Sequence, residues 1–397
     1  MRNGICIKLL KQTVLLLIAL ISIYVINGAG SFENAAVQTM VEAWPSLTPA
    51  TIRLMITLPS LTSTMIMMVI GQFVGKKISF RNTLILGSLC ILAGGVLPFF
   101  IHTNWYFILA CRIVLGLGMG MLSIRSSMLM LSAKPEDTAR FIGLGAVIGS
   151  LVSAAVAPIT GTLTKLGWYY PFLTNGIIII ALIMIMLFVK EPEKTLEKKK
   201  ASGKAKIPTL MYILLFAQFI LTLVLYPLLS GISTYLVELN LGDASVAGMM
   251  LSLYTGSGIV TNLCLKQLQK TFKAYVLPFF LLLPAIGLAL VLFTHNIILV
   301  AIGVFISGMG FITFSSTVQL YAGAICDENT IVKVSPYLLA MTQFGVFLSS
   351  YFIDFTSKLH WFNVEMQNPY FICLLIYLGS AIIAFIYRNK IYPYNSN

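Results

Sequence analysis

The stretches GMGMLSIRSS (Gly118–Ser127) and GMGFITFSST (Gly308–Thr317) decide the fold, because they are two copies of one motif in a chain of 397 residues. Each copy keeps both glycines and lies in the fourth apolar run of its half of the chain. A second match supports the repeat, since Pro171 and Pro369 both open a sixth run that continues with aromatic residues. A repeat of this kind predicts two related structural halves.

The composition places these halves in a membrane. Hydrophobic residues make up 58% of the chain and charged residues 10%, and the mean hydropathy is +0.93, whereas soluble proteins carry about 25% charged residues. Runs of about 20 apolar residues, enough to cross a bilayer as a helix, recur throughout. We therefore predict an all-α membrane protein with about twelve transmembrane helices, at residues 13–40, 52–73, 83–100, 105–131, 141–163, 171–189, 209–236, 245–265, 276–293, 297–322, 336–355 and 370–387.

The net charge of +13 reflects topology rather than a nucleic-acid partner. Lys and Arg concentrate in the loops that face the cytoplasm. With the N-terminus inside, only Arg53, Lys165 and Lys358 fall on the outer side. This asymmetry predicts that both termini are cytoplasmic, and the Lys-rich, Ile-rich composition is typical of a bacterial plasma-membrane protein.

The one long polar break, residues 190–208, predicts a cytoplasmic linker between two six-helix bundles, residues 1–189 and 209–397. Residues 1–31 also have the basic start, apolar middle and small-residue end of a secretory signal. Because removing them would leave an odd number of helices, we expect a retained first helix.

No pattern in the chain is typical of an enzyme or of a cofactor site. The six cysteines form no CxxC pair, the three histidines are scattered, and no P-loop is present. We therefore expect no enzyme activity, metal or cofactor. Two related halves joined by a linker are instead typical of an alternating-access transporter, whose substrate cavity lies between the halves.

Three motifs resemble the major facilitator superfamily, and the resemblance covers essentially the whole chain. RIVLGLGMG is similar to the arginine motif in the fourth helix of that family. The matching residues are Arg112, Gly116, Gly118 and Gly120. The fifth-helix motif of proton-driven exporters resembles APITG, which supplies Pro158 and Gly161. The loop between helices two and three resembles GQFVGKKISFRN, which supplies Gly71, Gly75, Lys76 and Arg81.

The resemblance implies a monomer that exchanges a small molecule for protons across the lipid bilayer. Two positions depart from the family pattern: Gly75 replaces an acidic residue, and Ala157 replaces a glycine. The first departure removes the acid from the usual cytoplasmic charge latch, and the second weakens the match to exporters.

Arg112 and Glu33 are the candidates for proton coupling. A charge inside a membrane costs about 3 kcal/mol or more and indicates a functional site, and the residue that matches Arg112 in the second copy is the apolar Ile302. Glu33 is the one acid in the first helix, where burial would favour its protonated form. The alternatives are that Arg112 snorkels to the headgroups and that Glu33 lies at the membrane interface.

Polar residues on apolar helices are the candidates for the substrate cavity. On the first helix they share one face, and they are Tyr24, Asn27, Ser31, Asn34 and Gln38. In the second half they are Gln218, Tyr226, Tyr235, Tyr254, Asn262, Thr313, Gln319 and Gln343. Asp354, by contrast, is expected to pair with Lys358.

These features favour a proton-coupled exporter of amphipathic drugs or metabolites. A proton-coupled uptake symporter, or an organic-anion carrier in which Arg112 binds the anion, is the alternative. A non-transporting membrane sensor is the third function considered.

Overall fold

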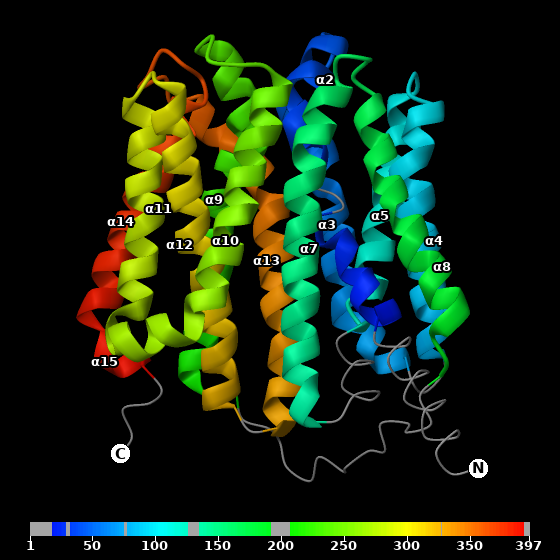
Figure 1. Cartoon of the computed structure of the whole chain (residues 1–397). Helices are drawn as coiled ribbons and strands as arrows, with labels where there is room; N and C mark the ends of the chain where they lie inside the picture. The colour runs from blue at the N-terminus through cyan, green and yellow to red at the C-terminus, as the bar shows by residue number, and fades with distance from the viewer. Residues whose placement is uncertain are drawn as a thin grey trace. The chain divides into compact units, whose positions relative to one another are not determined.

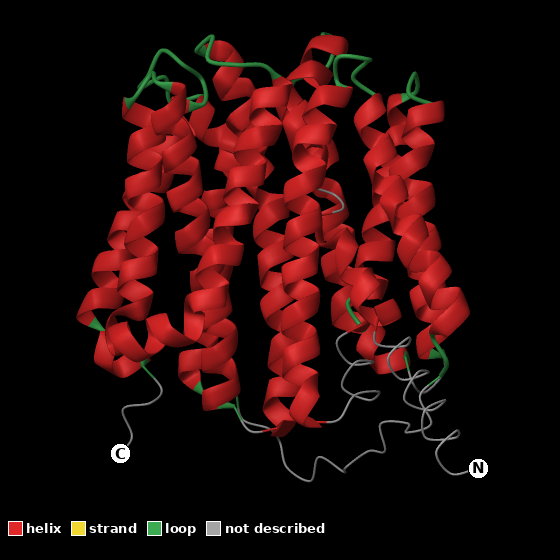
Figure 2. Cartoon of the chain, in the orientation of Figure 1, coloured by secondary structure: helices red, strands yellow, loops and turns green. Residues whose placement is uncertain are grey.

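The computed structural model describes residues 18–28, 32–74, 78–125, 135–191, 207–326 and 328–392. These residues form helices joined by loops (Figure 2). Those before the linker are η1 (Ile23–Gly28), η2 (Phe32–Ala36), α2 (Val37–Ala43), α3 (Pro49–Phe73), α4 (Phe80–Phe100), α5 (Trp105–Leu122), α7 (Pro135–Leu163), η3 (Tyr170–Ile177) and α8 (Ile178–Phe188). Those after it are α9 (Thr209–Glu238), α10 (Ala244–Phe272), η4 (Lys273–Tyr275), α11 (Val276–Phe293), α12 (Ile297–Ile325), α13 (Glu328–Ser357), α14 (Gln367–Ile386) and α15 (Arg388–Ile391) (Figure 1).

Within the described residues, ten helices are long and apolar enough to cross a membrane, and they correspond to ten of the twelve predicted spans. The other two are the first and the fifth. Residues 13–17 and 29–31 of the first lie outside the described part of the chain. The apolar part of the fifth, Val147–Leu163, is shorter than a full span.

The described part of the first span is not one continuous α-helix. Residues 18–22 are α-helical, residues 23–28 and 32–36 are 3₁₀ helices, and the α-helix α2 follows them. Gly28 is the last residue of the first 3₁₀ helix, and a glycine disfavours an α-helix by about 1 kcal/mol relative to alanine. This glycine therefore weakens the predicted α-helix at this point.

Side-chain caps determine where four of the membrane helices begin. The side chains of Ser79, Asn104, Asp243 and Asn296 accept hydrogen bonds from backbone N–H groups at the starts of α4, α5, α10 and α12. Residues with short polar side chains satisfy N–H groups that have no partner inside the helix. These caps explain why the helix starts agree with the predicted spans to within a few residues.

The chain divides into two compact units. Unit 1 contains Met1–Phe32, Leu58–Ser153 and Phe172–Ser202, and unit 2 contains Glu33–Thr57, Ala154–Pro171 and Gly203–Asn397. The boundaries cut through α3 and α7, so parts of both helices belong to the unit that holds the second half of the sequence. The division into bundles of residues 1–189 and 209–397 stays a prediction, and each unit is described by itself.

Equivalent glycine contacts reveal the true register of the repeat. In unit 1, a side chain at Gly116 on α5 would strike Pro59 on α3, and one at Gly118 would strike Gly87 on α4. In unit 2, a side chain at Gly308 on α12 would strike Tyr254 on α10, and one at Gly310 would strike Pro284 on α11. Gly116 is therefore the counterpart of Gly308, and Gly118 of Gly310.

This register corrects the sequence match between the halves by two residues. Glycines at every second position, as at Gly116, Gly118 and Gly120, still align after a shift of two residues. The sequence alone therefore aligns Gly118 with Gly308. In the structural register the counterpart of Arg112 is Val304, not Ile302. Arg112 is 0% exposed and Val304 1% exposed, whereas Ile302 is 43% exposed. The repeat thus buries a valine where unit 1 buries an arginine.

Candidate functional site

A stripe of polar residues runs along α9, which is otherwise apolar. Its members recur at intervals of four and then three residues, so they share one face of the helix. All are at most 7% exposed, and they are Gln218, Thr222, Tyr226, Ser230 and Ser233. Sequence reasoning found Gln218 and Tyr226 and missed the three hydroxyl residues, although their spacing was the available signal.

Gln218 is the centre of a polar cluster in unit 2. Its Nε2 donates to Ser315 Oγ on α12 at 3.2 Å and to Thr342 Oγ1 on α13 at 3.1 Å, and lies 3.5 Å from Thr222 Oγ1. Its Oε1 is buried and has no hydrogen-bond partner among the described residues. A buried acceptor without a partner is costly, so this oxygen is available to a donor on a bound molecule.

Two threonines on α12 add further buried hydroxyl groups. Thr313 and Thr317 are both 0% exposed, and neither Oγ1 has a hydrogen-bond partner within the described part of the chain. Buried polar atoms in proteins are almost always hydrogen-bonded, and exceptions often indicate a ligand or water. Tyr254 on α10 is also buried.

The segment that precedes α2 contacts the far part of the α9 stripe within unit 2. Asn34 Nδ2 donates to Tyr226 Oη at 3.2 Å, and Ser233 Oγ donates to the carbonyl oxygen of Ala35 at 2.9 Å. Glu33, next to Asn34, is 0% exposed. The structure therefore places a buried carboxyl group one residue away from a contact with the stripe.

A buried arginine that sequence reasoning assigned to the outer side joins α3 to the segment before α14. Arg53 is 1% exposed, its Nη1 lies 3.5 Å from Glu365 Oε1, and its Nη2 lies 3.5 Å from Met366 Sδ. One turn further on, Thr57 Oγ1 and Ser350 Oγ on α13 are 2.6 Å apart. The signal in the sequence was an arginine at the start of an apolar span.

The fifth-helix motif forms a close crossing of α7 and α10 in unit 2. A side chain at Gly161 would strike the carbonyl of Ala244, and one at Gly248 would strike the carbonyl of Ala157. Pro158 lies within this crossing and is half-buried. Small residues let helix backbones approach closely in membranes, which explains the role of Gly161.

An ion pair lies beside this crossing. Lys165 Nζ is 3.5 Å from Asp243 Oδ2, and both side chains are largely exposed. Hydrogen bonds from the backbone N–H of Val246, together with the charge of Lys165, hold the pKa of the Asp243 carboxyl below its ordinary value. The carboxylate thus caps α10 in its charged form.

In unit 1, Arg112 is completely buried on α5, and its guanidinium lies 5.7 Å from the centre of the Phe172 ring in η3. Tyr24 is also buried, and the guanidinium of Arg125 lies 4.4 Å from the centre of its ring. Arg112 does not reach the surface of the structure, which argues against the snorkelling alternative. Gly116, Gly118 and Gly120 lie in helix contacts rather than at a surface.

An acid from the end of α8 caps the start of α4. Glu191 accepts hydrogen bonds from the backbone N–H groups of Phe80, at 2.7 Å, and Arg81, at 3.0 Å. Arg81 Nη2 in turn donates to the carbonyl of Met186 at 3.0 Å. Sequence reasoning noted that Gly75 replaces the acid of the family's loop motif, and it did not consider Glu191. Gly75 and Lys76, and the surroundings of Gly71, lie outside the described residues.

Among the described residues, no hydrogen bond joins the remaining candidates to the Gln218 cluster. Gln38 donates to Glu42 at 3.0 Å, Gln319 is exposed, and Gln343 and Asn262 are half-buried. The hydroxyl of Tyr235 donates a hydrogen bond to the carbonyl oxygen of Val291, a contact between helices rather than with a cavity. Asn27 and Ser31 lie where no side chains are described. Asp354 does pair with Lys358, at 2.8 Å, as predicted.

A family model of the Major Facilitator Superfamily matches residues 13–350. The chain belongs to the Major Facilitator Superfamily. Solved structures of this superfamily's fold resemble it along nearly its whole length. They include the nucleoside transporter NupG, with a TM-score of 0.74 and 12% identity over 96% of this chain and 100% of that chain.

Two further solved structures cover a similar share. The D-xylose–proton symporter has a TM-score of 0.71 and 12% identity over 97% of this chain and 98% of that chain. The peptide transporter POT, in complex with sulfate, has a TM-score of 0.76 and 13% identity over 95% and 94%. No curated protein matches the chain. Membership of the Major Facilitator Superfamily identifies this protein as a multi-pass membrane transporter rather than an enzyme.

Proposed function

We propose that this transporter exports a small amphipathic organic solute across the plasma membrane in exchange for protons. The observation that carries the proposal is the α9 stripe, which is buried and uncharged. It is joined to a cluster whose amide oxygen has no hydrogen-bond partner among the described residues. A few polar groups in apolar surroundings suit a solute that has both polar and apolar parts. An organic-anion carrier would instead need a cation at this position.

Alternating access requires a gate, and we propose that the contacts between the two sequence halves inside unit 2 form it. Residues 33–57 and 154–171 contact α9, α10, α13 and the segment before α14. Opening this gate would separate Arg53 from Glu365 and Thr57 from Ser350. Rocking of residues 1–189 against residues 209–397 would open this gate while access from the other side of the membrane closes.

Glu33 is the proposed proton carrier. A carboxylate is costly to bury as an ion, so the closed gate favours its protonated form and contact with water favours release of the proton. Its neighbour Asn34 touches Tyr226 of the stripe, which would link proton release to occupation of the stripe. Arg112 is the second proposed coupling residue, because it is a fully buried cation in a predicted span.

Transport into proteoliposomes, with a pH gradient of either sign and a panel of neutral, anionic and cationic solutes, tests the proposal. We expect movement of an amphipathic solute against the proton flow. Movement with the proton flow would support the uptake symporter instead. A transport rate that does not depend on the pH gradient would rule out proton coupling.

The variant Glu33→Gln separates coupling from binding. We expect it to lose transport driven by the pH gradient but to keep exchange of labelled for unlabelled solute, since exchange needs no net proton movement. Glu42→Gln is the matched control, because Glu42 is an exposed acid nearby. If Glu33→Gln kept gradient-driven transport at the wild-type rate, Glu33 would not be the carrier.

A further inference from the structure

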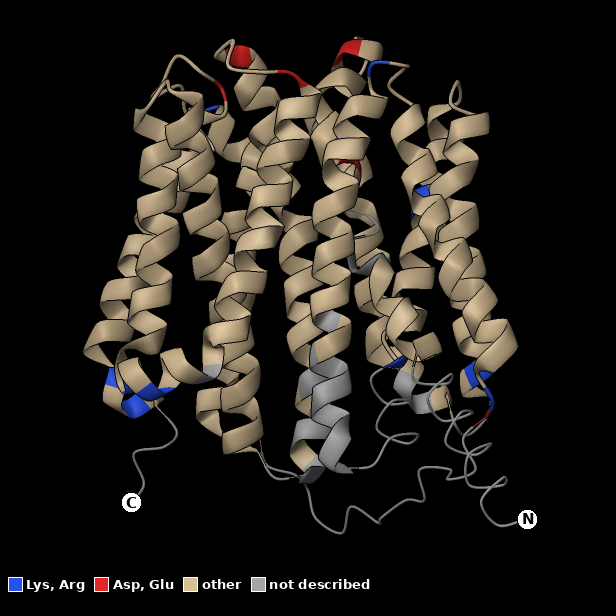
Figure 3. Cartoon of the chain, in the orientation of Figure 1, with Lys and Arg blue, Asp and Glu red and all other residues tan. Residues whose placement is uncertain are grey.

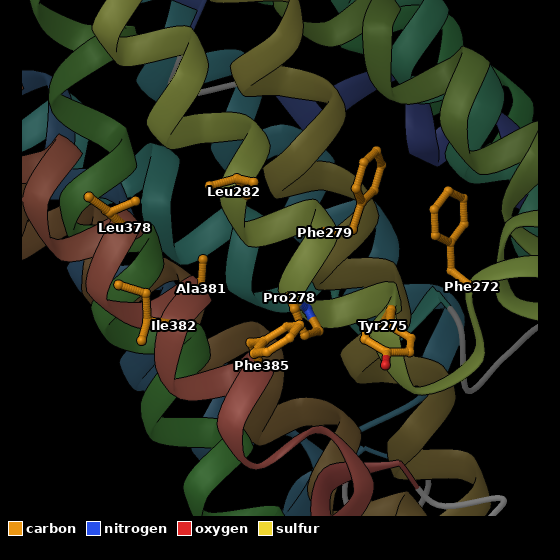
Figure 4. Close-up of a pocket in the computed structure, with 9 residues that line it drawn as sticks. All are labelled: Phe272, Tyr275, Pro278, Phe279, Leu282, Leu378, Ala381, Ile382 and Phe385. Carbon is orange, nitrogen blue, oxygen red and sulfur yellow. The ribbon is translucent and has the colours of Figure 1, made fainter.

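A groove of about 500 Å³ opens on unit 2 between α11, α14 and the turn that joins α10 to α11 (Figure 4). Its walls are apolar, and they include Phe272, Phe279, Leu282, Leu378, Ile382 and Phe385. The walls reach the surface, because Phe279 is 38% exposed and Ile382 is 54% exposed. A molecule in the surrounding bilayer could therefore enter the groove from the side.

The local sequence explains why the groove exists. The chain leaves α10 at Lys273, whose positive φ of 46° turns it into η4 and then α11. Across this turn, the Phe272 and Phe279 rings stack with their centres 4.8 Å apart, which forms one wall. On α14, the small Ala381 lines the groove between larger residues and leaves space there (Figure 4).

A cation is fixed at one end of the groove. The guanidinium of Arg388, the first residue of α15, lies 4.6 Å from the centre of the Phe385 ring and 4.9 Å from that of Tyr275. Its Nη1 donates to the carbonyl of Phe385 at 2.9 Å. Cation–π contacts with two aromatic residues that line the groove thus hold Arg388 in place. A guanidinium has about five N–H donors, of which this bond uses one.

The elements that form the groove carry positive charge alone at this end. Lys270, Lys273 and Lys390 are exposed on the neighbouring ends of α10, η4 and α15 (Figure 3). Residues 244–326 and 367–397, which supply every wall of the groove, contain no Asp or Glu. Asp243 precedes α10 and Glu365 precedes α14, so both lie at the opposite end of these helices, whereas Glu328 begins α13 at the same end as the cations. No acid on these elements neutralises the cations.

We propose that this groove binds one anionic glycerophospholipid, with an acyl chain along Phe279 and Ile382 and the phosphate at Arg388 and Lys273. Basic pockets between transmembrane helices are suited to anionic headgroups, and arginine binds phosphate through two parallel hydrogen bonds. Charge complementarity selects this occupant. A zwitterionic lipid carries its own cation beside the phosphate, and an apolar protein helix would gain nothing from Arg388.

Native mass spectrometry of the purified full-length protein, mixed with equal amounts of dioleoylphosphatidylglycerol and dioleoylphosphatidylcholine, tests the site. The wild type is expected to retain one phosphatidylglycerol in preference to phosphatidylcholine. Each cation near an anionic headgroup strengthens binding about fivefold, so Arg388→Gln combined with Lys273→Gln should weaken retention by tenfold or more. Lys358→Gln, at the opposite end of unit 2, is the control and should change nothing.

A second variant tests the apolar part of the site without altering charge. Ile382→Trp fills the groove and should abolish preferential retention, whereas Ile298→Trp, at an exposed apolar position on α12, should preserve it. Equal retention of both lipids by the wild type would overturn the proposal. Unchanged retention in the double variant or in Ile382→Trp would also overturn it.

Discussion

Gln218 reaches the hydroxyl groups of Ser315 and Thr342 through one amide nitrogen, and its carbonyl oxygen stays without a partner in the described residues. If a substrate donor completes this cluster, Gln218→Leu should weaken substrate binding about tenfold, which corresponds to one hydrogen bond of about 1.4 kcal/mol. Equilibrium binding of the transported solute measures the change. Gln267→Leu, at an exposed glutamine on α10, is the control, and equal effects of the two variants would exclude a role for the cluster.

Arg112 should behave as a functional charge rather than as a structural one, because the equivalent position in unit 2 is a buried valine, Val304. We expect Arg112→Ala to insert and fold but to lose transport driven by a pH gradient. Arg112→Lys should keep part of the activity, since it keeps the charge and loses the planar geometry. Transport by Arg112→Ala at the wild-type rate, with unchanged pH dependence, would contradict this role.

The residues that the sequence predicts and those that it misses differ in a physical way. Arg112 stands out as the one charge of α5 and Glu33 as the one acid of the first predicted span, and both are buried. Counting loop cations assigns Arg53 to the outer side, and it does not report that the side chain is buried against Glu365. That burial depends on residues more than 300 positions away in the chain, and no local pattern reports such a contact.

At the scale of single elements, the start of α10 depends on Asp243. Its Oδ1 accepts from the N–H groups of Ser245 at 2.9 Å and Val246 at 3.1 Å. Asp243→Ala should lower the free energy of unfolding by about 1 kcal/mol, the usual cost of losing an N-cap, whereas Asp243→Asn should lower it much less. Thermal unfolding in detergent measures both.

The pH dependence of this cap has a definite sign. Because the folded-state pKa of Asp243 lies below its ordinary value of 3.8, its charge stabilises the helix fully above that pH, and the stabilisation is lost as the pH falls below it. The difference in unfolding temperature between wild type and Asp243→Asn should therefore shrink in acid. A difference that grew instead would contradict the assignment.

Caps and apolar runs also show how far elements can be predicted from sequence. Ser79, Asn104 and Asn296 are short polar residues at the edges of apolar runs, so the starts of α4, α5 and α12 can be predicted from the sequence. The register between the two copies is not readable, because glycines at every second position fit equally well after a shift of two. Only the neighbours of each glycine, which lie on other helices, distinguish the alternatives.

For the whole molecule, the proposed gate gives the sharpest test of alternating access. The Thr57 and Ser350 oxygens are 2.6 Å apart, so cysteines at these positions are within reach of a disulfide. In a transport-competent variant without the six native cysteines, oxidation of Thr57→Cys/Ser350→Cys should abolish transport, and reduction should restore it. Full transport with a verified cross-link would rule out opening at this position.

A matched pair of cysteines controls for the cross-link itself. Thr48, just before α3, and Thr51, in the first turn of α3, have hydroxyl oxygens 2.8 Å apart, so a disulfide between cysteines there joins no separate helices. Its oxidation should leave transport unchanged.

The predicted halves, residues 1–189 and 209–397, differ from the two compact units because the contacts of the proposed gate draw parts of α3 and α7 into unit 2. Sequence periodicity describes each helix, and it does not report which helix ends meet in a given conformation.

The corrected register also records how the two halves diverged. At one crossing in unit 1, Gly120 on α5 packs against Ile66 on α3. At the equivalent crossing in unit 2, Ile312 on α12 packs against Gly258 on α10. The bulky and the small residue have changed places, and the combined volume of the pair is conserved. Two isoleucines would collide and two glycines would leave a void, so a change at one partner requires a compensating change at the other.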